Sequence, residues 1–322
     1  MFKLDKGTKI LIAVNTSLIL LIVGLYFVLF PEPKSESKTA QVEMSPTEAV
    51  AEVKPPEIPD VAPDREEMQN MIKYVLGSDL QKFAVFVFRP KMEKQPLIFQ
   101  SRPMPPASMI KMFVLAKGMQ DVKDGKMSLD ELITITPQNI VGGAGIIAGE
   151  GSGAKVPVRK AMELMITESD NTATNILIDR IGGLESINEY LKANGYNDTI
   201  FNHKMMLQQG QSNYSSVADL GLLFTRIYDH NCVDDYYDQI MIDYLLKQAD
   251  LDCFPSALPY WNIAHKTGEV ERLYDDGGIL YGAAGDFILV IMDENYTDRG
   301  GTIDKMKSIA ILIADKFMPP NH

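Results

Sequence analysis

The sequence predicts an α/β (α+β) domain in which an antiparallel sheet, flanked by the terminal helices of the domain, is joined to an all-helical lobe. Two observations support this prediction. Strand-like apolar runs occur near both ends of the domain, whereas the long middle part carries apolar residues at helical spacing. Strands far apart in the chain must therefore pair in one sheet, and the helices between them form the second lobe.

The folded domain is expected to span residues 64–322, beginning with an amphipathic helix from Asp64. Two short apolar runs follow, Phe83–Phe88 and Leu97–Phe99, with Pro90 in the polar stretch between them. This pattern predicts a β-hairpin. Helices are then expected over 108–122, 158–167, 173–181, 184–194, 216–228 and 235–247, strands over 262–266, 278–281 and 286–292, and a last helix over 303–317.

An uncharged run of 21 residues, Ile10–Phe30, precedes the domain and is long enough to cross a bilayer core of ~30 Å. Three lysines within residues 1–9 predict a single-pass anchor in the cell membrane, with a cytoplasmic N-terminus and an extracytoplasmic domain. A cleaved signal peptide is the alternative, but such peptides have shorter apolar cores that end in small residues. Residues 31–63 are rich in Pro and Glu, which predicts a disordered linker.

The composition argues against several classes of function. A net charge of −12 disfavours nucleic-acid binding, which needs a basic surface. None of the four histidines pairs with another His or a Cys at ligand spacing, so no metal and no other cofactor is expected. Cys232 and Cys253 either form a disulfide, if the domain is exported, or remain buried thiols. We expect a monomer.

Ser108-Met109-Ile110-Lys111 is the first motif with chemical potential, and it opens a predicted helix. A helix N-terminus offers free N–H groups and the positive end of the helix dipole. A residue three positions later returns to the same face of the helix, so the Lys111 amine can lie near the Ser108 hydroxyl. If desolvation and nearby cations lower its pKa, that amine can accept the hydroxyl proton.

Two further motifs follow in the chain. Ser169-Asp170-Asn171 lies between two predicted helices and offers a hydroxyl for proton relay and an amide for a substrate. Lys266-Thr267-Gly268 closes a predicted strand, where a glycine allows close approach of a substrate backbone and N–H groups can bind an oxyanion. Each motif alone is weak, because Ser35–Lys38 and Ser186–Asn188 match the first two patterns by chance. The signal is their joint occurrence in order, each on a suitable element.

These three motifs resemble the set found in class A β-lactamases and penicillin-binding proteins, and the resemblance covers residues 64–317. It implies a β-lactamase-like fold and a covalent acyl-enzyme. By this resemblance Ser108 is the nucleophile and Lys111 its activating base, directly or through water. Ser169 passes the proton to the leaving nitrogen, and Lys266 steadies Ser169 electrostatically.

The resemblance also implies a set of binding groups. Asn171 binds the amide side chain of a substrate, Thr267 holds its carboxylate, and Gly268 lies beside it. The backbone N–H groups of Ser108 and Glu269 form the oxyanion hole. The implied ligands are β-lactams or peptidoglycan peptides.

The chain departs from class A β-lactamases at two places. Those enzymes carry a glutamate on a loop after the second motif, which orients the water that hydrolyses the acyl-enzyme. Residues 199–218 contain no Asp or Glu, although His203, Gln208 or Gln209 can position a water. Glu269 replaces a small residue and repels a substrate carboxylate unless Lys266 or Arg272 compensates, and Arg272 is the candidate partner for that carboxylate.

Three functions follow from these patterns. The first is a D,D-peptidase-like acyl-hydrolase that penicillins acylate and that deacylates slowly, since general-base help is worth roughly 10²–10⁴ in rate. The second is a working β-lactamase with a substitute group that positions water. The third is a non-catalytic, tethered module that senses β-lactams or binds cell wall, which the intact motif set argues against.

Overall fold

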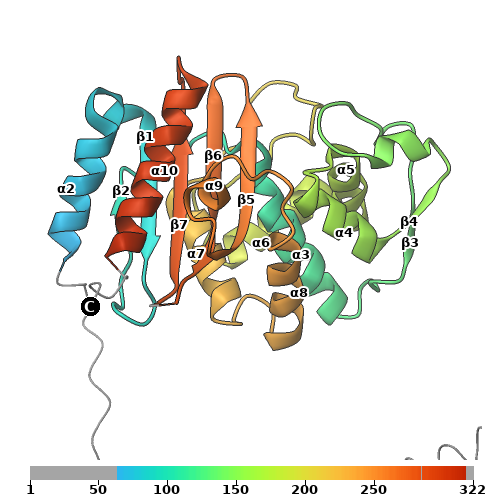
Figure 1. Cartoon of the computed structure of the whole chain (residues 1–322). Coiled ribbons are helices and arrows are strands. Elements are labelled where there is room, and N and C mark those ends of the chain that lie inside the picture. The colour runs from blue at the N-terminus through green and yellow to red at the C-terminus, as the bar shows by residue number, and fades with distance from the viewer. Residues whose placement is uncertain (1–63, 284, 317–322) are drawn as a thin grey trace, which may run out of the picture. The chain divides into compact units, whose positions relative to one another are not determined.

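The computed structural model describes residues 64–283 and 285–316 (Figure 1). The predicted anchor at residues 10–30, the predicted linker at 31–63 and the end of the last predicted helix lie outside these residues. Within the described ranges, none of the helices combines the length and the apolar character needed to cross a membrane.

A five-stranded sheet in the order β2-β1-β7-β6-β5 is the centre of the domain, and each strand runs antiparallel to its neighbours. The early and late strands meet where β1 pairs with β7, as the sequence predicts. The strands are β1 (Phe83–Phe88), β2 (Leu97–Phe99), β5 (Asn262–Val270), β6 (Leu273–Tyr281) and β7 (Phe287–Asp293).

Both faces of this sheet are covered by helices, which explains why β1 is apolar at every position. Its alternate side chains Phe83, Val85 and Val87 pack toward α2 (Arg65–Leu76) and α10 (Arg299–Asp315). Its remaining side chains pack into the second core, shared with the helical part of the molecule. Figure 1 shows α2 and α10 on one side of the strands and the helical lobe on the other.

The helical lobe is built around α3 (Lys111–Lys123), most of which is buried. The prediction of an all-helical lobe is nearly right, but a two-stranded ribbon at its edge was not predicted because its strands have three residues each. The other elements are α4 (Val158–Thr167), α5 (Asn171–Arg180), α6 (Gly183–Ala193), α7 (Val217–Tyr228), α8 (Asp235–Leu245), α9 (Phe254–Ala257), β3 (Leu132–Thr134), β4 (Lys155–Pro157) and three 3₁₀ turns, η1 (Gly77–Lys82), η2 (Ala107–Ile110) and η3 (Ile147–Glu150).

Strand β5 is longer than predicted, which changes the setting of the third motif. The sequence predicts that the strand ends at Lys266, but β5 continues to Val270 and turns directly into β6. The polar residues after Lys266 interrupt the apolar pattern, yet they pair in register with the start of β6. The motif therefore lies inside a strand rather than at its end.

The two cysteines are free thiols. Cys253 is buried in the core between the sheet and α10, whereas Cys232 packs against the core of the helical lobe. The sequence left open whether they form a disulfide; in this structure they lie in different cores and do not.

Candidate active site

Ser108 lies in η2, the tight turn that leads into α3, so the predicted serine at a helix start is confirmed in outline. Ala107 before it has a φ of 40°, which is a strained conformation for a residue with a side chain. The turn is closed by the Met109 N–H, which donates to the Pro106 carbonyl at 2.8 Å. This backbone presents Ser108 to a cleft while Lys111 begins the helix behind it.

Lys111 is fully buried. Its Nζ lies 2.5 Å from the Ser169 carbonyl oxygen, 2.8 Å from Asn171 Oδ1 and 3.1 Å from Ser169 Oγ. Burial, and then the charge of Lys266, hold the pKa of Lys111 well below its usual value. A neutral amine can donate to the two oxygen acceptors and keep its lone pair for a hydroxyl proton, which is the chemistry that a general base needs.

Ser169 lies between two lysines. Its Oγ is 3.1 Å from the Nζ of Lys111 and 3.1 Å from the Nζ of Lys266. Lys266 also donates to the Thr267 carbonyl at 2.6 Å, and burial lowers the pKa of Lys266 to about 7. A hydroxyl between two amines can pass a proton from one side to the other, which agrees with the relay implied for Ser169.

The backbone of the second motif is held by Asp170, to which the sequence assigned no role. Asp170 is buried and caps α5 by accepting from the Ala173 N–H at 2.7 Å. Its other oxygen accepts from the N–H groups of Ile146 and Ile147 at 2.6 and 2.7 Å. Ser169 itself has a φ of 53°. The carboxylate therefore fixes the strained turn that aims Ser169 and Asn171 at Lys111.

The third motif touches the first at Gly268. A Cβ atom at this position would lie 2.8 Å from the Pro106 carbonyl oxygen and 3.1 Å from the Ser108 nitrogen. Only glycine allows β5 to come this close to η2. The contact places the N–H of Ser108 and the strand residues on either side of Gly268 at one edge of the cleft, where an oxyanion would need its donors.

The cleft itself has a volume of about 350 Å³. It brings together Ser108, Ser169, Thr267 and Glu269, all predicted from the sequence, whereas Lys111 and Lys266 lie buried beneath it. The sequence did not identify its remaining lining residues, because they come from other segments: Ala144, Thr167, Glu168, Gln248, Ala249 and Asp250. Only Glu168 had an available signal, since it directly precedes Ser169 in the chain.

Arg272, the predicted partner of a substrate carboxylate, is not among the residues that line this cleft. It lies in the turn between β5 and β6, and its guanidinium donates to the carbonyls of Tyr296 at 3.3 Å and Asn295 at 3.4 Å. Glu269 is instead paired with Arg299, which donates from Nε at 2.6 Å and from Nη2 at 2.9 Å. Sequence analysis did not predict Arg299 as the partner of Glu269, because thirty positions separate the two residues and no motif links them.

The segment 199–218, where class A β-lactamases carry the deacylating glutamate, contacts α5 just after the second motif. Asn175 on α5 holds the backbone of Met205 by two hydrogen bonds, donating to its carbonyl at 3.1 Å and accepting from its N–H at 2.9 Å. Met205 is buried and Met206 is exposed. Two of the three alternatives named from sequence bond within their own loop: His203 Nδ1 contacts the Lys204 carbonyl at 2.8 Å, and Gln208 donates to Gly210 and Ser212.

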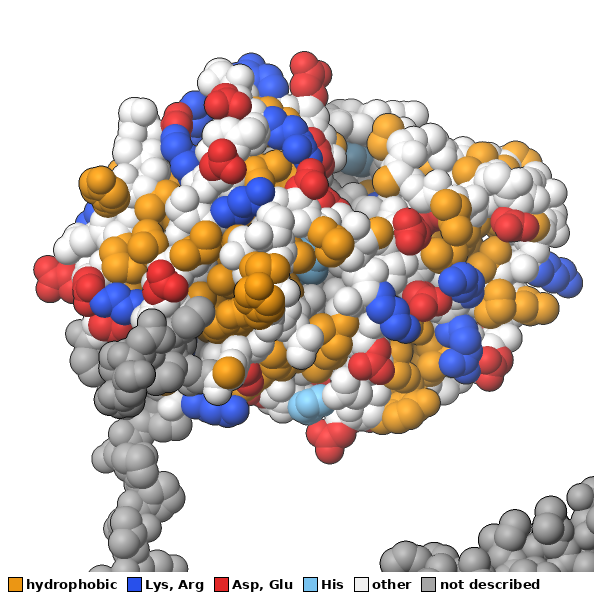
Figure 2. All heavy atoms as spheres, in the orientation of Figure 1, with side chains coloured by type: hydrophobic (Ala, Val, Ile, Leu, Met, Phe, Trp, Pro, Cys, Tyr) orange, Lys and Arg blue, Asp and Glu red, His pale blue; other side chains and the backbone are white. Residues whose placement is uncertain are grey.

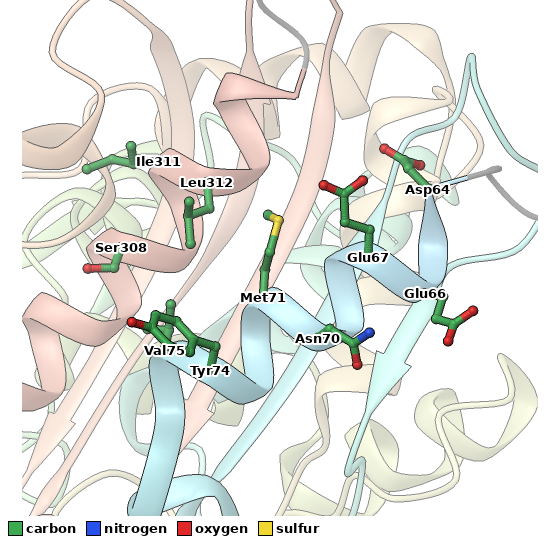
Figure 3. A pocket seen from close by; sticks show the side chains of 10 residues that line it. All are labelled: Asp64, Glu66, Glu67, Asn70, Met71, Tyr74, Val75, Ser308, Ile311 and Leu312. Carbon is green, nitrogen blue, oxygen red and sulfur yellow. The ribbon is translucent and has the colours of Figure 1, made fainter.

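A second, larger concavity lies between α2 and α10, on the far side of the sheet from the helical lobe (Figure 3). Its volume is about 930 Å³, and Met71, Val75 and Leu312 give it an apolar floor. It contains none of the motif residues. The smaller cleft at Ser108 is therefore the candidate active site.

Comparison with known proteins places this arrangement in a family. The beta-lactamase enzyme family matches residues 66–317. The beta-lactamase BRO-1 of Moraxella catarrhalis is 27% identical over 173 residues, which are 51% of this chain and 55% of that protein. The beta-lactamase VEB-1 of Pseudomonas aeruginosa is 24% identical over 46% of this chain and 50% of its own. The chain thus spans about half the length of these relatives.

Solved structures resemble most of the chain. The structure of PBP-A matches with a TM-score of 0.73 and 25% identity, covering 80% of this chain and 98% of the other. An ancestral class A beta-lactamase matches with a TM-score of 0.70 at 18% identity, covering 79% and 99%, which shows the shared fold. The family match spans most of the chain, and the sheet and helices form the β-lactamase-like fold that the sequence predicts. This protein belongs to the beta-lactamase enzyme family and has the fold of penicillin-recognising serine hydrolases.

Proposed function

We propose that this protein is an extracytoplasmic serine acyl-hydrolase that forms an acyl-enzyme with D-Ala-D-Ala-type amides and with β-lactams, and that it releases the acyl group slowly. The observation that carries the acylation half is the position of Ser169 Oγ, 3.1 Å from both buried lysine amines, in the cleft that contains Ser108. Among its relatives by structure, a PBP-A mutant has been described as an acyl-enzyme complex with penicillin G.

In the proposed acylation, Ser108 Oγ attacks the carbonyl carbon of the substrate. The C–O bond forms, the hydroxyl proton passes to the neutral Lys111 amine, and the C–N bond of the substrate breaks. Ser169 transfers the proton from Lys111 to the leaving nitrogen, while the Lys266 amine on its other side supports the relay. The N–H groups of Ser108 and Glu269 hold the oxyanion during the attack.

Deacylation needs a base that takes a proton from water, and the structure supports a slow step here. The segment clamped by Asn175 offers thioether side chains at Met205 and Met206, which cannot accept a proton at neutral pH. Residues 199–218 contain no carboxylate. Loss of general-base help lowers a rate by roughly 10²–10⁴, so the acyl-enzyme should accumulate.

The test is to incubate the full chain with a fluorescent penicillin and, separately, with a chromogenic cephalosporin. A stable fluorescent adduct with little turnover of the cephalosporin supports the proposal, and Ser108→Ala should remove the adduct without changing the melting temperature. Absence of any adduct or turnover, with D-Ala-D-Ala peptides as well, contradicts the proposal and leaves a non-catalytic tethered module.

A working β-lactamase is the second candidate, because two carboxylates besides Glu269 line the same cleft. Glu168 and Asp250 belong to segments other than 199–218 and face the space beside Ser169. Either can position water if the acyl group leaves room. Rapid cephalosporin turnover that falls by about 10² or more in Glu168→Gln or Asp250→Asn would establish this function in place of the first.

We further propose that residues 10–30 hold the protein in the cell membrane with the domain outside. The proposal rests on the uncharged run and the lysines before it. Cell fractionation should recover the full chain in the membrane pellet after an alkaline wash, and a protease added to intact spheroplasts should remove the domain. Recovery of a soluble chain that begins near residue 31 would show a cleaved signal peptide instead.

A further inference from the structure

Glu269 presents a problem for the proposed substrates, which carry a carboxylate at the end that meets β5. Its side chain lines the cleft next to Thr267, the residue implied to hold that carboxylate. Two like charges close together repel, and they repel more strongly in a partly dry cleft than in water. A cation close to Glu269 must offset this repulsion if anionic substrates are to bind.

The lysines of the motifs are poorly suited to this task. Lys111 donates away from Glu269, to Ser169 and Asn171. Lys266 donates to Ser169 and to the Thr267 carbonyl, and burial lowers its pKa to about 7. Both amines are therefore engaged in the proton relay, and Lys266 loses its charge as the pH rises through its pKa of about 7.

Arg299 has the geometry that the task needs. Its guanidinium meets the Glu269 carboxylate with two parallel hydrogen bonds, at 2.6 and 2.9 Å, the arrangement that gives the strongest ion pairs. A third hydrogen bond, of 3.1 Å, joins Nη2 to Asp252. Guanidinium stays charged at any pH at which the protein is folded.

A platform under the guanidinium fixes its position. Cζ of Arg299 lies 5.2 Å from the centre of the Tyr274 ring, and Tyr274 is the cross-strand partner of Glu269. The Tyr274 hydroxyl donates at 3.2 Å to Asp250, which also lines the cleft. Arg299 is the first residue of α10. The end of the sheet where β5 turns into β6 and α10 begins carries acidic and basic side chains side by side (Figure 2).

We propose that Arg299 is a specificity-determining residue: by neutralising Glu269 it lets the cleft accept an acyl donor with a carboxylate. The inference rests on the proposed function of the same site. Arg299 acts through Glu269 and does not itself touch the reacting atoms. Removing its charge should penalise anionic substrates and leave neutral substrates of the same shape almost unaffected.

The experiment compares benzylpenicillin with its methyl ester, which lacks the charge. Second-order acylation rates are measured for the full chain and for Arg299→Gln. We expect a loss of about tenfold, equal to about 1.4 kcal/mol, with the anion and a change within about twofold with the ester. High salt should shrink the loss, because it screens charges near the surface.

Further variants separate charge from structure. Arg299→Lys keeps the charge and should lose about threefold or less with the anion, because it cannot form the double bond to Glu269. Glu269→Gln combined with Arg299→Gln should restore the preference for the anion. Arg180→Gln is the matched control, since Arg180 makes an equivalent double contact with Glu131, at 2.6 and 2.7 Å, outside the cleft lining.

The outcomes can be told apart. If the unmodified chain is acylated but Arg299→Gln slows both substrates equally, Arg299 has only a structural role and the inference fails while the proposed function stands. If Arg272→Gln rather than Arg299→Gln costs the preference for the anion, the compensating cation predicted from sequence is the right one. If the unmodified chain is not acylated by either substrate, the proposed function fails and this inference fails with it.

Discussion

Two regions next to the second motif and α5 differ sharply in their chemistry. On one side, Lys111, Ser169 and Lys266 form a dry, continuous set of proton donors and acceptors. On the other, Asn175 holds the backbone of Met205 by two hydrogen bonds, yet the side chains of this segment, Met205 and Met206, are thioethers. Hydrogen bonds fix both regions, but only the region of Lys111, Ser169 and Lys266 contains groups that can transfer a proton. This comparison is the basis for our proposal that the acyl intermediate forms readily and is released slowly.

The largest effect is expected from removing the amine on the proton-moving side. Lys111→Met keeps an unbranched side chain of nearly the same length but deletes the base, so acylation by a fluorescent penicillin should fall by roughly 10²–10⁴. The rate of adduct formation measures it, and an unchanged melting temperature excludes unfolding. A loss smaller than about tenfold would mean that another group activates Ser108.

The next prediction supplies the missing base on the other side. Met205→Glu places a carboxylate on the segment that Asn175 holds, and release of the penicilloyl group should accelerate by about 10² or more. Decay of the purified fluorescent adduct is the measurement. Met206→Glu is the matched control. Asn175 binds the backbone of Met205 and not that of Met206, and the Met206 side chain is exposed, so the release rate should gain little in this variant. Equal acceleration in both variants would contradict the placement at Met205.

A variant at Gly268 tests whether the third motif must touch the first. Gly268→Ala puts a methyl group 2.8 Å from the Pro106 carbonyl oxygen, which is backbone and cannot move aside cheaply. We expect a loss of unfolding free energy of about 1–3 kcal/mol, together with slower acylation. Urea unfolding and adduct formation check both parts. Normal acylation in a destabilised variant would show that the contact serves folding alone.

The smallest expected effect is the pH dependence of acylation. Burial lowers the pKa of Lys266 to about 7, so its ammonium loses a proton as pH rises through that value. Acylation by an anionic penicillin should therefore fall by up to about tenfold between about pH 6 and about pH 8, because the positive charge near the substrate carboxylate is lost. The neutral methyl ester should show a flatter profile.

The sign of that change is informative, because Lys111 acts in the opposite direction. A base gains as it deprotonates, so a rate that rises over this pH range would mean that Lys111, and not Lys266, titrates there. Measuring the profile of Lys266→Arg, whose charge persists at all these pH values, identifies the group.

Much of the fold followed from local pattern. The apolar run of β1 and the helical periods of α4, α7 and α8 lie within one or two residues of their predicted bounds, because both periodicities are written directly in the chain. The ribbon of β3 and β4, the extension of β5 beyond Lys266 and the first five residues of β6 were missed. Their residues are polar or few, and only pairing with a neighbouring strand makes them strands.

The sequence by itself determined the fold class and four of the residues that meet at the cleft, because three short motifs on recognisable elements carry Ser108, Lys111, Ser169 and Lys266. Tertiary structure alone decided what surrounds them. Asp170 holds the second motif through N–H groups of a different segment, and Arg299 rather than Arg272 meets Glu269. Such contacts join residues far apart in the chain. The packing of helices and loops against the sheet decides which distant charges meet, and the spacing of residues along the sequence does not predict this.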